Sequence, residues 1–180
     1  MIKALSESVQ TRPVAPVLIA LFVGFSLFSP YFLTSGNMEA MLTANSVVLI
    51  ASIGMTLVFL LGGIDLSIST VISVSAVISG LVMASTGSIW LGAMAAMAVG
   101  LIIGLVNGLL IGVLGLTPFI TTMATQLRAR GIAFVLSEGI AVQGTPYGML
   151  DYGFLIILGI PAVTLTALLI VIACVLLVKL

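Results

Sequence analysis

The sequence predicts an all-α, polytopic membrane protein with about six transmembrane helices, and two observations carry this prediction. The 180 residues are 62% hydrophobic and only 6% charged, whereas a soluble domain of this size needs far less apolar side chain. The apolar residues also form several runs of the length, about 20 residues, that a helix needs to cross a bilayer. Glycine, proline and short polar clusters separate these runs. We expect residues 1–180 to form a single membrane domain.

The same composition excludes several function classes. Five basic and five acidic residues leave no net charge, so no basic face is available for nucleic acid. The chain has no histidine and a single cysteine, Cys174, which excludes an intrachain disulfide and a His/Cys metal cluster. Neither a Walker-type phosphate loop nor a nucleophile–base pair can be assembled from the sequence. We therefore expect no metal, no cofactor and no catalytic activity.

The first expected span is Val14–Leu33, which lies within an uncharged stretch. A cleaved signal peptide is the alternative interpretation. The run is long for a signal peptide and no small-x-small cleavage site follows it, so we favour a retained anchor. Pro30 and the cluster Ser35-Gly36-Asn37 are expected to end this span.

The second expected span, Ala44–Leu61, ends at a polar break, Gly62-Gly63-Ile64-Asp65, and the whole membrane domain is organised around this turn. The two glycines accept positive φ and can end a helix. Asp65 can cap the next helix by accepting hydrogen bonds from its first amides. A transporter can use such a break to place free backbone groups near a solute. A short hairpin turn with an N-cap explains the same residues equally well on local grounds.

The third and fourth expected spans, Leu66–Ala84 and Trp90–Leu114, contain no charge. In the fourth span, glycine recurs at four-residue spacing, at Gly100, Gly104, Gly108 and Gly112. Because another backbone can approach where Cβ atoms are missing, we expect this glycine stripe to pack against a partner helix. Asn107 projects about 20° from the first glycine of the stripe. It either bonds the partner helix, which we favour, or faces a polar path.

The fifth expected span starts at Thr117 and runs to Ser137, with Pro118 in the first turn, where its missing N–H costs nothing. The first half of this span is amphipathic and cannot face lipid all round. Arg128 and Arg130 lie about 200° apart on it, so no single interior face receives both. Either protein or water surrounds them, or they lie near an interface where the guanidinium groups reach solvent, which we favour.

The sixth expected span is Phe154–Val178, bent or re-entering at Pro161, after a glycine-rich loop over residues 138–153 that has no Lys or Arg. Six spans place both termini on one side of the membrane. The basic residues on that side are Lys3, Arg12 and Lys179, and the acidic residues on the other side are Glu39, Glu138 and Asp151. This segregation fits the positive-inside rule with both termini cytoplasmic and the loop 138–153 periplasmic.

Four motifs, in order along the chain, carry a resemblance to a known family. They are Ser52–Ser67, Gly104–Leu110, Thr117–Thr122 and Arg130–Ala133. Together they resemble permease subunits of bacterial ABC importers for ribose, xylose and similar sugars. The resemblance implies an inner-membrane permease that works with a cytoplasmic ABC ATPase, a periplasmic sugar-binding protein and a second permease subunit, as a homo- or heterodimer in the lipid bilayer. ATP hydrolysis would then occur on a separate subunit.

The resemblance also implies a translocation path for a pentose or related monosaccharide. Candidate path residues come from the break, the fourth span and the start of the fifth, namely Gly62, Gly63, Asp65, Asn107, Thr117, Phe119, Thr121 and Gln126. Members of the family continue past the position of Lys179 into a cytoplasmic segment that docks on the ATPase. The chain therefore resembles the N-terminal half of such a permease, as a truncated gene product or a fragment, and we do not expect it to transport alone.

Two other function classes remain open on the sequence. One is a secondary transporter in which Asp65 and Arg128 form a proton or ion relay, since charged residues inside a membrane are functional candidates by default. The other is a non-transporting membrane scaffold in which every polar feature is structural. The sequence does not name the sugar, because solute choice depends on side chains from several helices whose facing it does not give.

Overall fold

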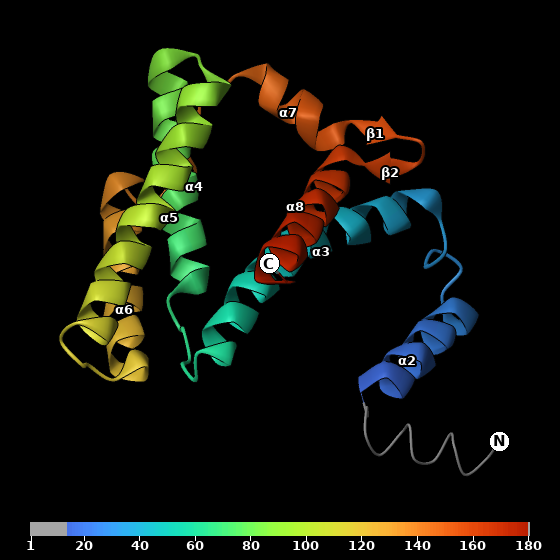
Figure 1. Cartoon of the computed structure of the whole chain (residues 1–180). Helices are drawn as coiled ribbons and strands as arrows, with labels where there is room; N and C mark the ends of the chain where they lie inside the picture. Colours follow the sequence, from blue (N-terminus) through green and yellow to red (C-terminus); the bar gives the residue numbers. More distant parts are fainter. Residues whose placement is uncertain (1–13, 180) are drawn as a thin grey trace, which may run out of the picture. The chain divides into compact units, whose positions relative to one another are not determined.

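The computed structural model describes residues 14–179 of the chain. These residues form seven helices and one short hairpin (Figure 1). In chain order the elements are α2 (Val14–Phe28), α3 (Ser35–Leu60), α4 (Ile68–Thr86), α5 (Ile89–Gly112), α6 (Pro118–Leu136), α7 (Tyr147–Phe154), β1 (Ile156–Ile157), β2 (Ile160–Pro161) and α8 (Ala162–Lys179). The chain divides into two compact units, one up to Ala44 and one from Asn45 onward. Lys3 and Arg12, which support the predicted topology, lie outside the described residues.

The helices confirm a multi-pass, all-α membrane protein. Within the described part, α3, α4 and α5 are each long and apolar enough to cross a membrane. The helices α2 and α8 are also apolar but shorter. The remaining long helix, α6, buries the polar side chains of Thr121 and Thr122 and exposes apolar ones, in agreement with its predicted amphipathic character. Three helices rather than six therefore have the length and composition of a span on their own.

In the N-terminal unit, the first helix is shorter than the predicted span. α2 ends at Phe28 and not at Leu33, because Pro30 disfavours helical backbone at the residue before it and cannot continue the helix. The cluster Ser35-Gly36-Asn37 begins α3, whereas the sequence analysis expected it to end a span. Asn37 Nδ2 donates a hydrogen bond of 2.7 Å to the carbonyl of Phe32, which ties this start to the preceding turn.

The end of α3 confirms the predicted role of the first glycine of the break. The N–H of Gly62 bonds the carbonyl of Phe59 at 2.9 Å, and the N–H of Gly63 bonds that of Val58 at 3.0 Å. Gly62 has φ +77°, as this C-terminal motif requires. Gly63 has no positive φ but is buried, and a Cβ there would lie 3.5 Å from Pro118 Cβ. The first glycine is thus needed for its backbone angle, whereas a Cβ at the second would meet Val58 Cγ1 at 3.3 Å and Pro118 Cβ at an ordinary contact distance.

The helices α4, α5 and α6 pack together as a three-helix group. In Figure 1, α4 and α6 run in the same direction and α5 runs in the opposite one. Their shared core contains Val74 of α4 with Ala129 and Ala133 of α6. Two alanines in this core let the parallel helices α4 and α6 approach closely, so the polar residues near their first turns are brought side by side.

Within the described part of the chain, α4 packs against α5 at another glycine and not at the glycine stripe. α4 approaches α5 at Gly92, where an added Cβ would lie 2.3 Å from Met83 Cγ and 3.0 Å from the carbonyl of Ser79. An added Cβ would meet nothing within 4 Å at the four stripe glycines, Gly100, Gly104, Gly108 and Gly112. A spacing of four residues turns the stripe by about 40° per step, so the stripe rotates away from α4 along the part of α5 that follows Gly92. No helix of the described part packs against the stripe, so its packing against a partner helix stays a prediction.

The end of α6 uses the same hydrogen-bonding motif as α3 but with an unfavourable residue. The N–H of Glu138 bonds the carbonyl of Val135 at 3.3 Å, and the N–H of Gly139 bonds that of Phe134 at 3.1 Å. Glu138 therefore occupies the left-handed position, with φ +53°, that glycine fills in α3. A residue with a Cβ costs about 1–2 kcal/mol in this conformation, so the position is strained.

We expect Glu138→Gly to raise the thermal unfolding midpoint of the chain in detergent, because it removes strain of about 1–2 kcal/mol and adds a smaller entropic cost of about 0.5–1 kcal/mol for glycine. Circular dichroism at 222 nm would measure this. The control is Glu138→Ala, which removes the carboxylate but keeps the Cβ and should not stabilise the chain. Equal stabilisation by both variants would show that the charge, and not the backbone angle, is unfavourable at this position.

The sixth predicted span begins later than expected. Residues 147–154 form the short helix α7, and Ile156–Ile157 pair antiparallel with Ile160–Pro161 in a hairpin. The last helix, α8, starts at Ala162, directly after the proline that was expected to bend the span. A buried hydrogen bond of 2.9 Å from Ser46 Oγ of α3 to Thr164 Oγ1 holds the start of α8 against α3.

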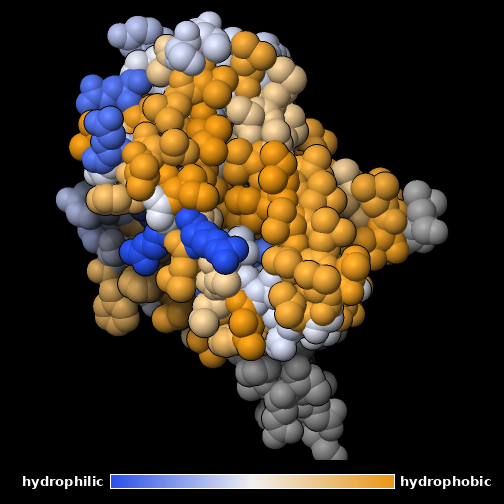
Figure 2. All heavy atoms as spheres, turned by 90° about the vertical axis from the view of Figure 1, so that its left-hand side faces the viewer, coloured by the Kyte–Doolittle hydropathy of each residue, from blue (hydrophilic) through white to orange (hydrophobic). Residues whose placement is uncertain are grey.

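The surface is largely apolar, as expected for a protein in a bilayer. Figure 2 shows mostly hydrophobic side chains on the face that carries α5 and α6, with a local group of strongly hydrophilic ones. Leu101, Leu105 and Leu109 of α5 are all exposed. Arg128 and Arg130 of α6 are also exposed, so neither is enclosed between helices of the described part.

Candidate functional site

Between α3 and α4 the chain forms neither a helix nor a strand. We call residues 62–67 the linker segment. It leaves the end of α3 at Gly62 and rises beside the three-helix group before α4 begins at Ile68 (Figure 1). The predicted break is therefore longer than a tight turn. Side chains of α5 and α6 bond this segment, as the following contacts show.

Asp65 lies in the middle of the linker segment and organises Ser67. Its Oδ1 accepts hydrogen bonds from the N–H of Ser67 at 2.7 Å and from Ser67 Oγ at 2.6 Å. The N-cap of α4 is Ser67, whose side chain makes no capping bond, so the prediction that Asp65 caps the helix is wrong. The reason is that α4 begins at Ile68, later than expected, so the carboxylate bonds the N-cap residue Ser67 and not the first amides of the helix.

Asn107 of α5 connects the linker segment to α6. Its Nδ2 donates to Ser67 Oγ at 3.3 Å, and its Oδ1 accepts a hydrogen bond of 2.6 Å from Thr125 Oγ1. Only 7% of its surface is exposed. The favoured expectation, that Asn107 bonds a neighbouring helix, is confirmed. We call the chain of bonds through Asp65, Ser67, Asn107 and Thr125 the polar relay.

Thr122 fixes the linker segment from the other side. Its Oγ1 accepts a hydrogen bond from the N–H of Leu66 at 3.2 Å and donates one to the carbonyl of Ile64 at 3.2 Å. Ser67, Thr122 and Thr125 were not among the predicted path residues. The signal for Ser67 was its position two residues after an aspartate, where an Asx turn forms. The two threonines are three residues apart and therefore lie on one face of α6.

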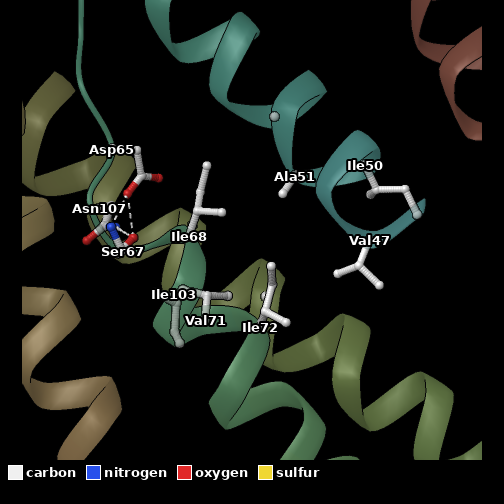
Figure 3. Close-up of a pocket in the computed structure, with 13 residues that line it drawn as sticks. Val47, Ile50, Ala51, Asp65, Ser67, Ile68, Val71, Ile72, Ile103 and Asn107 are labelled. Carbon is white, nitrogen blue, oxygen red and sulfur yellow. Dashed lines mark hydrogen bonds between the residues drawn. The ribbon is translucent and has the colours of Figure 1, made fainter. Parts of the chain in front are cut away.

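A pocket of about 310 Å³ opens beside the polar relay, between α3, α4 and α5 (Figure 3). Its polar residues, Asp65, Ser67 and Asn107, gather at one end. Apolar residues form the rest of the wall, namely Val47, Ile50, Ala51, Ile68, Val71, Ile72 and Ile103, with Gly54, Gly100 and Gly104. Within the described residues all the hydrogen bonds of the Asp65 carboxylate go to Oδ1, which leaves Oδ2 available to a ligand.

The pocket contains only part of the predicted path. Asp65 and Asn107 line it together, and Gln126 lines a second, more open pocket of about 480 Å³ that Asp65 also borders. The other candidates line neither pocket, namely Gly62, Gly63, Thr117, Phe119 and Thr121. The last of these is 4% exposed, and its Oγ1 has no hydrogen-bond partner in the described part of the chain.

Comparison with known proteins identifies the family. The sequence profile of a transport family, described as the permease component of branched-chain amino acid transport systems, matches residues 37–180. The chain belongs to this permease family. The matched region begins in the first turn of α3 and includes the linker segment, the polar relay and the whole pocket.

Related permeases are named for sugars. The fructose import permease protein FruF of Bifidobacterium longum (strain NCC 2705) is 38% identical over 144 residues. The L-arabinose ABC transporter permease protein AraH of Azospirillum brasilense is 36% identical over 139 residues. The ribose import permease protein RbsC of Escherichia coli (strain K12) is 33% identical over 130 residues. The resemblance to sugar ABC permeases that the sequence motifs indicated is thereby confirmed.

These similarities cover most of this chain but a minor part of each relative. They include 77%, 76% and 70% of this chain, against 40%, 40% and 39% of FruF, AraH and RbsC respectively. The chain thus spans about two fifths of the length of these permeases. No solved structure matches it.

Proposed function

We propose that the chain forms part of the transmembrane permease subunit of an ATP-driven importer, and that its solute is a pentose or related monosaccharide. The observation that carries the proposal is the pocket at the polar relay, in a chain whose relatives are named for fructose, L-arabinose and ribose. The pocket joins a free carboxylate oxygen to an apolar wall. Ligand sites of this size commonly combine a mostly apolar lining with a few placed polar groups.

The linker segment adds donors and acceptors that a helix would not offer. In a bilayer, non-helical backbone is tolerated only where protein buries it or where it lines a water-filled cavity. Ile68 is the first residue of α4 and lines the pocket. The N–H groups of the first turn of a helix have no carbonyl partner within the helix. Sugar hydroxyls both donate and accept hydrogen bonds, so Asp65 Oδ2 and the free N–H groups at the start of α4 suit a monosaccharide together.

We infer that the permease works with three further proteins, namely a cytoplasmic ABC ATPase, a periplasmic sugar-binding protein and a second permease subunit. The assembly lies in the bacterial inner membrane. The segregation of basic and acidic residues supports a cytoplasmic position for both chain termini. With this orientation the linker segment lies at the cytoplasmic side of the membrane, and the loop 138–153 lies at the periplasmic side. A secondary transporter relay is less well supported, because Asp65 and Arg128 line different pockets.

The test is uptake of labelled sugar by cells that contain the complete permease with its ATPase and binding protein. We expect Asp65→Asn to lower uptake at least about tenfold, since a hydrogen bond to a charged group contributes about 1.5–3 kcal/mol. Asp151→Asn is the matched control, since it changes an exposed carboxylate outside both pockets.

Unchanged uptake by the Asp65 variant, at equal membrane abundance, would remove this carboxylate from the solute path. Leucine should be supplied in parallel, because the family description refers to branched-chain amino acids. Uptake of leucine without uptake of ribose, arabinose or fructose would overturn the proposed sugar specificity. The 180-residue chain alone, expressed beside the same ATPase and binding protein, should import none of them.

A further inference from the structure

The region between α6 and α8 presents an apolar surface that points away from the protein. The helix α7 is held on its inner side by two contacts. An added Cβ at Gly148 would lie 3.2 Å from Ile89 Cδ1 at the start of α5, and the hydroxyl of Tyr152 forms a hydrogen bond with Thr166 Oγ1 of α8. These contacts place α7 at the end of the three-helix group where α5 begins.

The outer side of α7 carries aromatic and aliphatic residues. Tyr147, Leu150 and Phe154 fall within an arc of about 60° on the helix, and Gly148 and Tyr152 lie on the other side. Tyr147 is 85% exposed and Phe154 is 80% exposed. Asp151 lies at one edge of this arc and is also exposed. The short helix is therefore amphipathic, with its apolar side outward.

The hairpin after α7 exposes a leucine in an unfavourable backbone conformation. Ile157 pairs with Ile160, so the loop has two residues, Leu158 and Gly159, with φ +53° and +80°. Such a turn favours asparagine or glycine at its first position. Leu158 is nevertheless found there and is 98% exposed. In water, this residue would combine backbone strain with full exposure of an apolar side chain.

We propose that the outer side of α7 and the hairpin tip are immersed in the membrane–water interface, in contact with phospholipid. We call Tyr147, Leu150, Phe154 and Leu158 the interfacial surface. An exposed Leu158 is favourable there because acyl chains replace water around it. Tyrosine and other amphipathic aromatic rings are enriched at this depth. The carboxylate at the edge of α7 can remain in the headgroup layer, as in helices that lie in the interface plane.

Two further observations favour lipid over a soluble partner. Trp90, the second residue of α5, is 81% exposed at the same end of the molecule, where tryptophan marks the boundary of a bilayer. The hairpin also continues directly into α8, whose Leu169 and Ile172 are exposed as in a lipid-facing helix. The interfacial surface is thus continuous with surfaces that a multi-pass membrane protein presents to lipid. This inference does not depend on the proposed solute.

The chain has one tryptophan, so single-tryptophan fluorescence can measure depth directly. Trp90→Phe provides the background. Leu158→Trp and Phe154→Trp then place the only indole on the interfacial surface, and Gln143→Trp places it at an exposed polar position of the preceding loop. Each variant is reconstituted in phosphatidylcholine vesicles with unlabelled or brominated acyl chains, and matching circular dichroism establishes that it is folded.

We expect the Leu158 and Phe154 variants to show blue-shifted emission and strong quenching by brominated lipid, and the Gln143 variant to be quenched by aqueous iodide instead. Two substituted positions keep the test decisive if one variant does not fold. Iodide quenching of both interfacial variants at the level of the Gln143 variant would overturn the proposal. Emission that becomes shielded only after a sugar-binding protein is added would also overturn it, in favour of a protein contact.

Discussion

Replacing Asn107 by alanine is expected to destabilise the helical part of the chain strongly. Asn107 is 7% exposed and bonds two partners, Ser67 Oγ at 3.3 Å and Thr125 Oγ1 at 2.6 Å. Each buried group that loses its partner costs about 1–3 kcal/mol, so a loss of several kcal/mol is expected for the pair together. The measurement is the thermal unfolding midpoint of purified chain in detergent, followed by circular dichroism.

A double-mutant cycle separates the polar relay from the loss of packing. Asn107→Ala is combined with Thr125→Val, which keeps the shape of the threonine but removes its donor. The coupling between these residues should be about 0.5–3 kcal/mol, because they share a hydrogen bond. Thr56→Val is the control, since Thr56 is exposed on α3 and bonds only the carbonyl of Ser52. Additive effects of Asn107→Ala and Thr125→Val would contradict the relay.

The second large effect is expected at Gly92. An added Cβ would lie 2.3 Å from Met83 Cγ, and Met83 is 2% exposed, so its side chain has no free space to move into. Gly92→Ala should therefore force α4 and α5 apart and destabilise the chain by about 1–3 kcal/mol, the usual cost of overpacking. Gly92→Val should cost more. Both are measured as shifts of the thermal midpoint in detergent.

The glycine stripe on the same helix provides the matched control. A Cβ at Gly108 meets nothing within 4 Å, so Gly108→Ala relieves the backbone entropy of glycine, about 0.5–1 kcal/mol, without a clash. The two alanine substitutions should thus shift the midpoint in opposite directions. Destabilisation by Gly108→Ala equal to that by Gly92→Ala would show that the stripe is packed against another helix after all.

Local chemistry made parts of the fold predictable. Gly62 was predictable because a left-handed residue at a helix end needs no knowledge of the neighbouring helices. The position of α6 was predictable for a similar reason, since Thr117 is its N-cap and Pro118 its first residue. Asp65 was correctly selected as the polar residue of the break. Its assigned role was wrong, because capping depends on the residue at which the next helix begins, and α4 begins at Ile68.

The remaining features depend on contacts between elements. Glycines at four-residue spacing rotate by about 40° per step around the helix, which takes the stripe away from α4, so Gly92 packs against α4 in the described part and the stripe does not. Thr125 bonds Asn107, 18 residues earlier in the chain, because α5 and α6 are antiparallel. The sequence does not show which residues of these two helices lie opposite each other. The hairpin was missed because Ile156 and Ile157 are as compatible with the start of an apolar helix as with a strand.

The parallel direction of α4 and α6 has an electrostatic consequence. Both helices begin beside the linker segment, since α4 starts at Ile68 and the second turn of α6 bonds Leu66 through Thr122. The partial positive charges at the N-termini of α4 and α6 therefore lie near the linker segment, together with the partial negative charge at the C-terminus of α3, which ends at Leu60. Asp65 is the acidic residue of the linker segment and supplies the opposite charge. Its carboxylate is stabilised locally by the two hydrogen bonds that it accepts from Ser67, the N-cap residue of α4.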